Sequence, residues 1–141
     1  MPEILRQVYV VEDDEDIRAS LRLLLEDAAY HVEEAADGMA ALAFLERNEQ
    51  PWVVLLDNVM PSLDGIGVLE ALAARPQVAE RLAIIFLSAR RPTFNEQKKR
   101  LLAEGTFAQV AKPFDLDELL LLIEQASQHL MARLTTSGNS P

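Results

Sequence analysis

The sequence predicts an α/β domain built on a parallel sheet, and three observations support this fold class. Short runs rich in Val, Ile, Leu and aromatic residues recur along the 141-residue chain, as strands buried on both faces require. A segment of helical period follows each run, and strands separated by helices pair in parallel. Four of the runs end in residues with polar side chains. The predicted strands are residues 8–11, 31–35, 52–56, 82–87 and 107–111.

The first part of the chain carries two predicted helices around a weakly indicated strand. Apolar residues at helical spacing predict a helix over about residues 15–28. The strand at 31–35 carries the weakest signal of the five. A second helix is predicted over residues 38–48, with its apolar side chains on or near one face. Pro51 breaks the chain before the third strand.

Two further helices have recognisable ends. The third is predicted over residues 66–73 and should stop before Pro76, because the residue before a proline disfavours the helical conformation. The fourth is predicted to begin with Thr93 and Glu96, which have the spacing of a capping box. Gly105 is a suitable C-terminal stop for that helix.

The last helix begins with a variant of the same signal. Asp115 and Glu118 have capping-box spacing, and the helix is predicted to run to about residues 130–133. Residues 135–141 are small and polar, so we expect a disordered tail or the start of a linker. Residues 1–134 are therefore predicted to form a single domain.

Bulk composition narrows the function classes. The net charge of -10 argues against nucleic-acid binding, which depends on Lys and Arg neutralising phosphates. The absence of cysteine excludes disulfides, thiolate metal sites and thiol catalysis. No apolar run approaches the length of a membrane span, and residues 1–11 do not have the pattern of a signal peptide. We expect a soluble, cytoplasmic protein.

Charge is unevenly distributed along the chain. An unbroken acidic run covers residues 12–16, directly after the first strand, where carboxylates would repel one another without a cation. A basic cluster could be either a solvated surface or a face for a partner. The members of that cluster are Arg90, Arg91, Lys98, Lys99 and Arg100.

Right-handed crossovers leave few possible topologies for this element order. We predict a flavodoxin-like (βα)5 doubly wound parallel sheet with strand order 2-1-3-4-5. Its switch point lies between the first and third strands, where ligands bind beyond the carboxyl ends. Glu12, Asp13 and Asp57 should meet there.

The residues at the strand ends suit Mg²⁺ and a phosphoryl group. Asp13 and Asp57 are the preferred direct ligands, with Glu12 binding directly or through water. Asp57 could also attack a phosphoryl group and form an acyl phosphate. Lys112 and Ser88 could then each hold a phosphoryl oxygen. The alternative for Asp13 is a helix cap, which its position fits equally well, and Asp14 is expected to be one.

The chain resembles the receiver domain of two-component response regulators over roughly residues 5–130. Four segments carry the resemblance: Val10–Arg18, Leu55–Gly65, Leu87–Ala89 and Ala111–Phe114. The resemblance implies that Asp57 accepts a phosphoryl group from a histidine kinase or phosphotransfer protein.

The same resemblance implies roles for the other site residues. Glu12 and Asp13 would organise Mg²⁺, with Glu12 in place of the commoner aspartate, and the backbone carbonyl of Val59 would complete the metal site. Ser88 would be the hydroxyl that moves toward the phosphoryl group, and Lys112 would contact it.

One position departs from the family pattern. Such domains usually carry Tyr or Phe three residues before the lysine, and this chain has Gln109 there. Strand periodicity places Phe107 on the same face, so Phe107 could substitute for the usual aromatic switch.

The leading functional hypothesis is therefore a signalling switch, and not an enzyme beyond assisting its own phosphorylation and dephosphorylation. The face formed by residues 82–133 would change and recruit a downstream protein or a second copy. One alternative is an interaction module that does not switch. Another is a haloacid-dehalogenase-type phosphatase, but its general acid would fall at Val59, which cannot transfer a proton.

Overall fold

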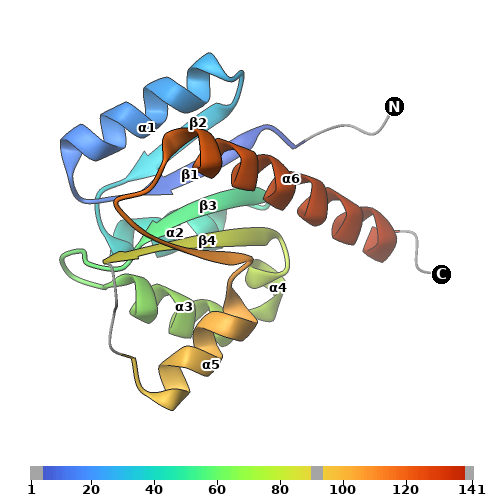
Figure 1. Cartoon of the computed structure of the whole chain (residues 1–141). Helices are drawn as coiled ribbons and strands as arrows, with labels where there is room; N and C mark the ends of the chain where they lie inside the picture. The colour runs from blue at the N-terminus through green and yellow to red at the C-terminus, as the bar shows by residue number, and fades with distance from the viewer. Residues whose placement is uncertain (1–4, 90–93, 139–141) are drawn as a thin grey trace.

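The computed structural model of this chain describes residues 5–89 and 94–138 (Figure 1). The strands are β1 Gln7–Val11, β2 His31–Ala35, β3 Trp52–Asp57, β4 Leu82–Ala89 and β5 Ala108–Lys112. The helices are α1 Glu15–Asp27, α2 Gly38–Arg47, α3 Gly65–Ala73, α4 Pro76–Ala79, α5 Glu96–Gly105 and α6 Leu116–Gly138.

The strands form one parallel sheet in the order β2-β1-β3-β4-β5, which confirms the predicted fold class and topology. In the register of β1 against β3, Val11 pairs with Leu56. The residues that follow this pair on the two strands therefore leave the sheet at the same level. This is the switch point of the predicted topology.

Two cores cover the two faces of the sheet. Along β1, Val8 and Val10 face the core under α1 and α6, whereas Tyr9 and Val11 face the core under α2, α3 and α5. Figure 1 shows the resulting three layers, with α1 and α6 on one side of the sheet. Because β1 and β3 are buried on both faces, their ends are held rigidly where the site forms.

Most predicted boundaries agree with the structure to within a few residues, and the start of α5 is two residues later than predicted. Asn95 is the N-cap, and its Oδ1 accepts a hydrogen bond from the Lys98 N–H at 2.8 Å. The observed N-cap therefore lies two residues after Thr93, where the predicted capping box begins. Thr93 itself lies outside the described residues, as do Arg90 and Arg91.

The short helix α4 was not predicted. Pro76 stands at its first position, where a proline lacks only a donor that the helix would leave unpaired in any case. The same proline marks the predicted limit of α3, which indeed ends at Ala73.

Helix α6 begins where predicted but continues beyond residues 130–133. Asp115 caps its start by accepting from the Glu118 N–H at 3.0 Å. Near its end, the Arg133 guanidinium donates to the carbonyl of Glu80, just after α4, at 2.8 Å and to that of Leu82, the first residue of β4, at 2.9 Å. Leu134 packs on the core. The helix continues to Gly138, five residues beyond residue 133. That residues 135–141 form a tail or the start of a linker stays a prediction.

Among residues 5–89 and 94–138, no helix combines the length and apolar character that crossing a membrane requires.

Candidate functional site

The site is built from acidic residues at the ends of β1 and β3. Glu12 follows β1 and is only 1% exposed, and Asp57 ends β3 and is only 3% exposed. Asp13, the next residue after Glu12, is exposed. One carboxylate oxygen from each of the three lies within 4.8 Å of the others. Three clustered carboxylates at this spacing fit a hard divalent cation such as Mg²⁺.

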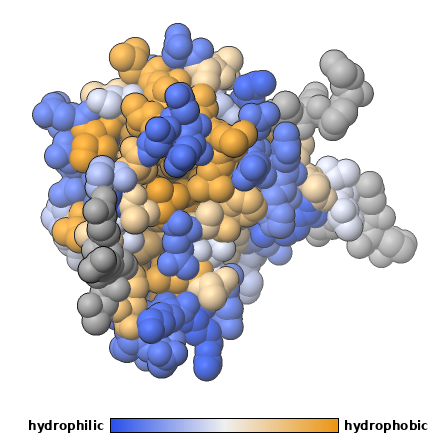
Figure 2. Space-filling model, in the orientation of Figure 1, coloured by the Kyte–Doolittle hydropathy of each residue, from blue (hydrophilic) through white to orange (hydrophobic). Residues whose placement is uncertain are grey.

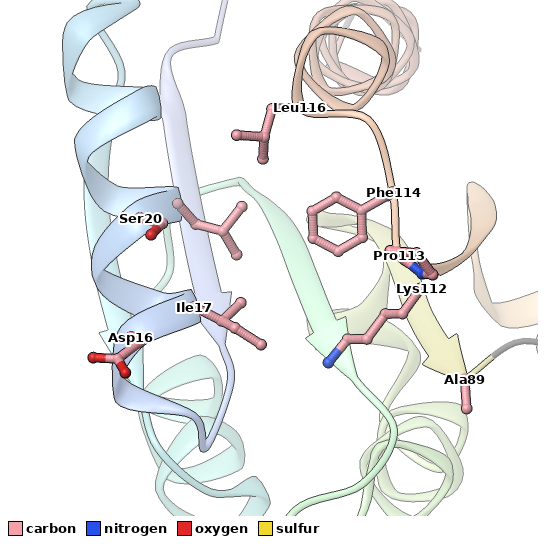
Figure 3. Close-up of a pocket in the computed structure, with 9 residues that line it drawn as sticks. Asp16, Ile17, Ser20, Ala89, Lys112, Pro113, Phe114 and Leu116 are labelled. Carbon is pink, nitrogen blue, oxygen red and sulfur yellow. The ribbon is translucent and has the colours of Figure 1, made fainter.

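Lys112 joins the cluster from the end of β5. Its Nζ donates to Glu12 Oε1 at 2.9 Å and lies 2.7 Å from Asp57 Oδ1. Figure 3 shows the Lys112 side chain reaching from β5 toward the carboxyl end of β3. The peptide bond between Lys112 and Pro113 is cis. The lysine therefore contacts the two buried acids directly.

The electrostatics of the cluster are unbalanced in favour of negative charge. The pKa of Glu12 is raised to about 7, chiefly by burial, and the nearby Asp57 carboxylate contributes to the rise while Lys112 opposes it. Burial alone would lower the pKa of Lys112, but its hydrogen bonds to Asp57 and Glu12 outweigh burial and raise it. One ammonium thus faces three acids. A bound cation would relieve the remaining repulsion.

Ser88 lies beside this cluster on β4, and Val59 lies in the loop that follows β3. Ser88 is buried on β4, one residue beyond Leu87, which pairs with Asp57 across the sheet. Register therefore places Ser88 next to the phosphoacceptor candidate, on the neighbouring strand. The Val59 side chain is 70% exposed. The predicted contribution of Val59 is its backbone carbonyl as a metal ligand, and this role stays a prediction.

The acidic run after β1 divides by function. Asp14 is the N-cap of α1, and its Oδ1 accepts from the Ile17 N–H at 3.0 Å, as predicted. Because Asp14 caps α1, the Asp13 carboxylate is not needed as a helix cap. Asp13 is therefore left to join Glu12 and Asp57 at the candidate metal site.

Gly65 is a supporting residue that sequence reasoning missed. Its N–H donates to the Asn58 carbonyl at 2.8 Å, so the start of α3 lies directly against the end of β3. A Cβ at this position would lie 2.6 Å from the Asp57 carbonyl oxygen and 2.9 Å from Asn58 Cα. Only glycine permits this approach without a shift of the backbone that carries Asp57.

We expect Gly65→Ala to destabilise the protein by about 1–3 kcal/mol, the usual cost of inserting a methyl group into a packed region. Gly105→Ala is the matched control, because the nearest atom to its added Cβ is 3.8 Å away. Alanine favours helices over glycine by up to about 1 kcal/mol, so the control should be neutral or stabilising. Urea unfolding measures both variants. A Gly65→Ala protein as stable as the control would contradict the argument.

The predicted role of Phe107 as a substitute for the aromatic at Gln109 is not supported by its position. Gln109 is exposed and pairs with Phe86, whose side chain lies in the core under α3 and α5. Phe107 packs in the opposite core, with its ring 5.2 Å from that of His129 on α6. The strand begins only at Ala108, so its alternation does not extend to Phe107.

An aromatic residue from outside β5 packs against Phe86, the strand partner of Gln109. Phe94, just before α5, packs edge-on against Phe86 with ring centroids 6.4 Å apart. Hydrophobic periodicity could not predict this contact, because Phe94 lies outside any strand.

An apolar groove of about 580 Å³ opens beside Lys112, between α1 and the segment that joins β5 to α6 (Figure 3). Ile17 and Leu21 line it from α1, and Pro113 and Phe114 line it from the opposite side. Figure 2 shows hydrophobic surface over this part of the molecule. The buried acids thus lie next to a surface that a partner could contact.

The fold and the site together define a class of protein: a doubly wound α/β domain with an acidic site, contacted by a lysine, at the carboxyl edge of its sheet. The family model for the response regulator receiver domain matches residues 8–124. This chain belongs to the response regulator receiver domain family, as its sequence motifs predict.

Known relatives agree with this assignment. The response regulator MprA of Mycobacterium sp. (strain KMS) is 36% identical over 135 residues, which cover 96% of this chain and 54% of MprA. The chain thus spans about half the length of that relative. The CheY-like receiver domain protein of Methanospirillum hungatei JF-1 has a TM-score of 0.78 and 27% identity, covering 88% of this chain and 95% of that chain.

A third similar protein has a metal in its structure. The receiver domain of sensor histidine kinase PA1611 from Pseudomonas aeruginosa PAO1 has a TM-score of 0.73 and 25% identity, covering 87% of this chain and 98% of that chain. A magnesium ion is coordinated in the active site cleft of that domain.

Proposed function

We propose that this chain is a phosphorylation-controlled receiver in which Asp57 accepts a phosphoryl group from a phosphohistidine on a histidine kinase or phosphotransfer protein. The observation that carries the proposal is the buried Asp57 carboxylate, grouped with Glu12 and Asp13 and contacted by Lys112 at 2.7 Å. Membership of the receiver family supports the kinase or phosphotransfer partner.

The proposed reaction transfers one phosphoryl group. An oxygen of the Asp57 carboxylate forms a bond to phosphorus while the bond from phosphorus to the donor imidazole nitrogen breaks, and the nitrogen keeps the electron pair. Lys112 is placed to hold one phosphoryl oxygen, since its Nζ already lies beside Asp57. The Ser88 hydroxyl, on the neighbouring strand, would donate to another.

The residues at the site fit Mg²⁺, with Glu12, Asp13, Asp57 and the Val59 carbonyl as the proposed ligands. When bound, Mg²⁺ would supply positive charge that offsets the carboxylates and the incoming phosphoryl oxygens. The magnesium ion in the PA1611 receiver domain supports the same choice of metal.

The proposed output is a change in the face formed by β4, α5, β5 and α6. Movement of Ser88 and Lys112 toward the phosphoryl group would shift the population of conformations on this face. A downstream protein or a second copy of the chain would then bind there. The exposed Lys98, Lys99 and Arg100 on α5 favour an acidic partner. We place the protein in the cytoplasm, without nucleic-acid or membrane binding by this domain.

One observation favours a second candidate, a receiver-like interaction module that does not switch. Gln109 is exposed, and Phe107 lies on the other face of the sheet, so neither provides the usual aromatic group. Amide exchange with and without beryllofluoride separates the two candidates. Protection that changes only around Asp57, and not in α5 or β5, would favour the module.

The proposed function is tested by incubating the protein with a small acyl phosphate and measuring its mass. We expect a gain of one phosphoryl group that requires Mg²⁺ and disappears when a chelator is added first. No gain in the presence of Mg²⁺ would contradict the proposal. Repeated turnover of a phosphate ester would instead support the phosphatase alternative.

A further inference from the structure

Arg18 reaches from α1 to the backbone of the acidic site. Its Nη1 donates to the Glu12 carbonyl oxygen at 2.8 Å, and its Nε lies 3.4 Å from Glu34 Oε1 on β2. The Arg18 side chain is only 17% exposed. The guanidinium is therefore held between the end of β1 and the neighbouring edge strand, and its planar fork suits two acceptors at once.

Glu34 is itself held in place. The Arg22 Nε donates to Glu34 Oε2 at 2.9 Å, one helical turn beyond Arg18. Arg22 also donates to the Val32 carbonyl at 3.2 Å and to Glu26, but the structure shows no bond from it to Glu12. The two arginines thus share Glu34, and only Arg18 connects it to the site.

The backbone of Glu12 is tied on both sides of its Cα. The Glu12 N–H donates to the Ala35 carbonyl on β2 at 3.1 Å, and the Glu12 carbonyl accepts from Arg18. The Glu12 carbonyl belongs to the peptide plane that leads into Asp13. Arg18 therefore fixes the orientation of the plane that joins two of the three clustered acids.

We propose that Arg18 is a positioning residue for the metal site, which it supports by fixing the peptide plane between Glu12 and Asp13 while Glu34 holds its guanidinium. The inference rests on the proposed function, because it concerns the proposed Mg²⁺ ligands. Partners of metal ligands typically change metal affinity by about 10–100-fold when they are replaced.

If Arg18 acted only through its charge, its removal would change the Mg²⁺ affinity in the opposite direction. Arg18 brings a positive charge close to a site for a cation, so removing that charge should strengthen Mg²⁺ binding if charge were its only effect. Removing a group that positions the ligands should weaken binding. The direction of the change in Mg²⁺ affinity thus separates the two roles.

The test is a calorimetric titration of the full chain with Mg²⁺ at constant ionic strength. We expect Arg18→Met to bind Mg²⁺ about tenfold more weakly than the wild type. Arg22→Met is the matched control, since it removes the same charge and the same partner, Glu34, but no bond to Glu12. We expect its affinity to stay within about twofold of the wild type, because screened charges act weakly at this range.

Arg18→Lys is a second variant that tests the same contact if Arg18→Met does not fold. Lysine keeps the charge but lacks the fork that reaches both Glu12 and Glu34, so binding should still be weaker than in the wild type. Thermal unfolding shows whether each variant is folded. Wild-type affinity in the Arg18 variants, tighter binding, or an equal loss in Arg22→Met would overturn the inference. A wild-type protein that binds no Mg²⁺ would overturn the proposed function itself.

Discussion

Replacing Asp57 with asparagine is expected to abolish the uptake of a phosphoryl group from a small acyl phosphate. The amide keeps the shape of the side chain but removes the nucleophilic carboxylate oxygen. Asp57 is buried, and its Oδ1 contacts the Lys112 ammonium at 2.7 Å, so it is the carboxylate around which the proposed site is built. Intact-protein mass spectrometry should show the gain in the wild type and none in Asp57→Asn.

Asp64→Asn provides the matched control for this experiment. Asp64 lies at the end of the loop that follows β3, is exposed, and caps α3 by accepting from the Gly67 N–H at 2.7 Å. Asparagine is an equally good N-cap, so this variant should fold and gain mass as the wild type does. An Asp57→Asn protein that still gains a phosphoryl group would place the acceptor elsewhere.

Lys112→Met is expected to have the second-largest effect, slowing phosphoryl uptake by about 100-fold. This is the typical cost of removing one group that stabilises developing charge in a transition state. Among the described residues, Lys112 alone forms ion pairs with both Glu12 and Asp57, at 2.9 and 2.7 Å. Uptake is measured as the rate of mass gain at fixed Mg²⁺ and phosphodonor concentrations.

The same substitution should also lower stability in the absence of metal. Removing one partner of a buried ion pair costs about 3–5 kcal/mol, and we expect less here because the Lys112 side chain is 26% exposed. Mg²⁺ should restore more stability to Lys112→Met than to the wild type, because it replaces the missing positive charge. Lys99→Met, which removes an exposed ion pair with Glu96 on α5, should change neither the rate nor the stability appreciably. Unchanged uptake in Lys112→Met would contradict the proposed contact with the phosphoryl group.

Sequence patterns predict the fold and the clustering of the site residues for one shared reason. Asp57 and Lys112 each end a strand, and in an open parallel sheet the carboxyl ends lie along one edge. Strand order then follows from right-handed crossovers, and it places the ends of β1 and β3 side by side. Periodicity is sufficient for these inferences because they depend on which residues end a strand.

Features that depend on individual contacts could not be predicted in this way. The bond from Arg18 to the Glu12 carbonyl depends on one rotamer, and the close approach of Gly65 depends on how α3 lies against β3. The position of Phe107 could not be predicted from strand periodicity, because the alternation of side chains between the two faces of the sheet does not extend to the residue before β5. The extra turns of α6 depend on Arg133 bonding to the backbone at the start of β4, far away in the sequence.

We propose that Asp57 carries the phosphoryl group as an acyl phosphate. Borohydride reduces an acyl phosphate to an alcohol, so treating the phosphorylated wild-type protein should convert residue 57 to homoserine, which peptide mass spectrometry locates. We predict homoserine at position 57 and an unchanged aspartate at Asp13 and Asp64. Reduction at another acid, or a phosphoryl group found on a side chain other than Asp57, would show that Asp57 is not the phosphoacceptor.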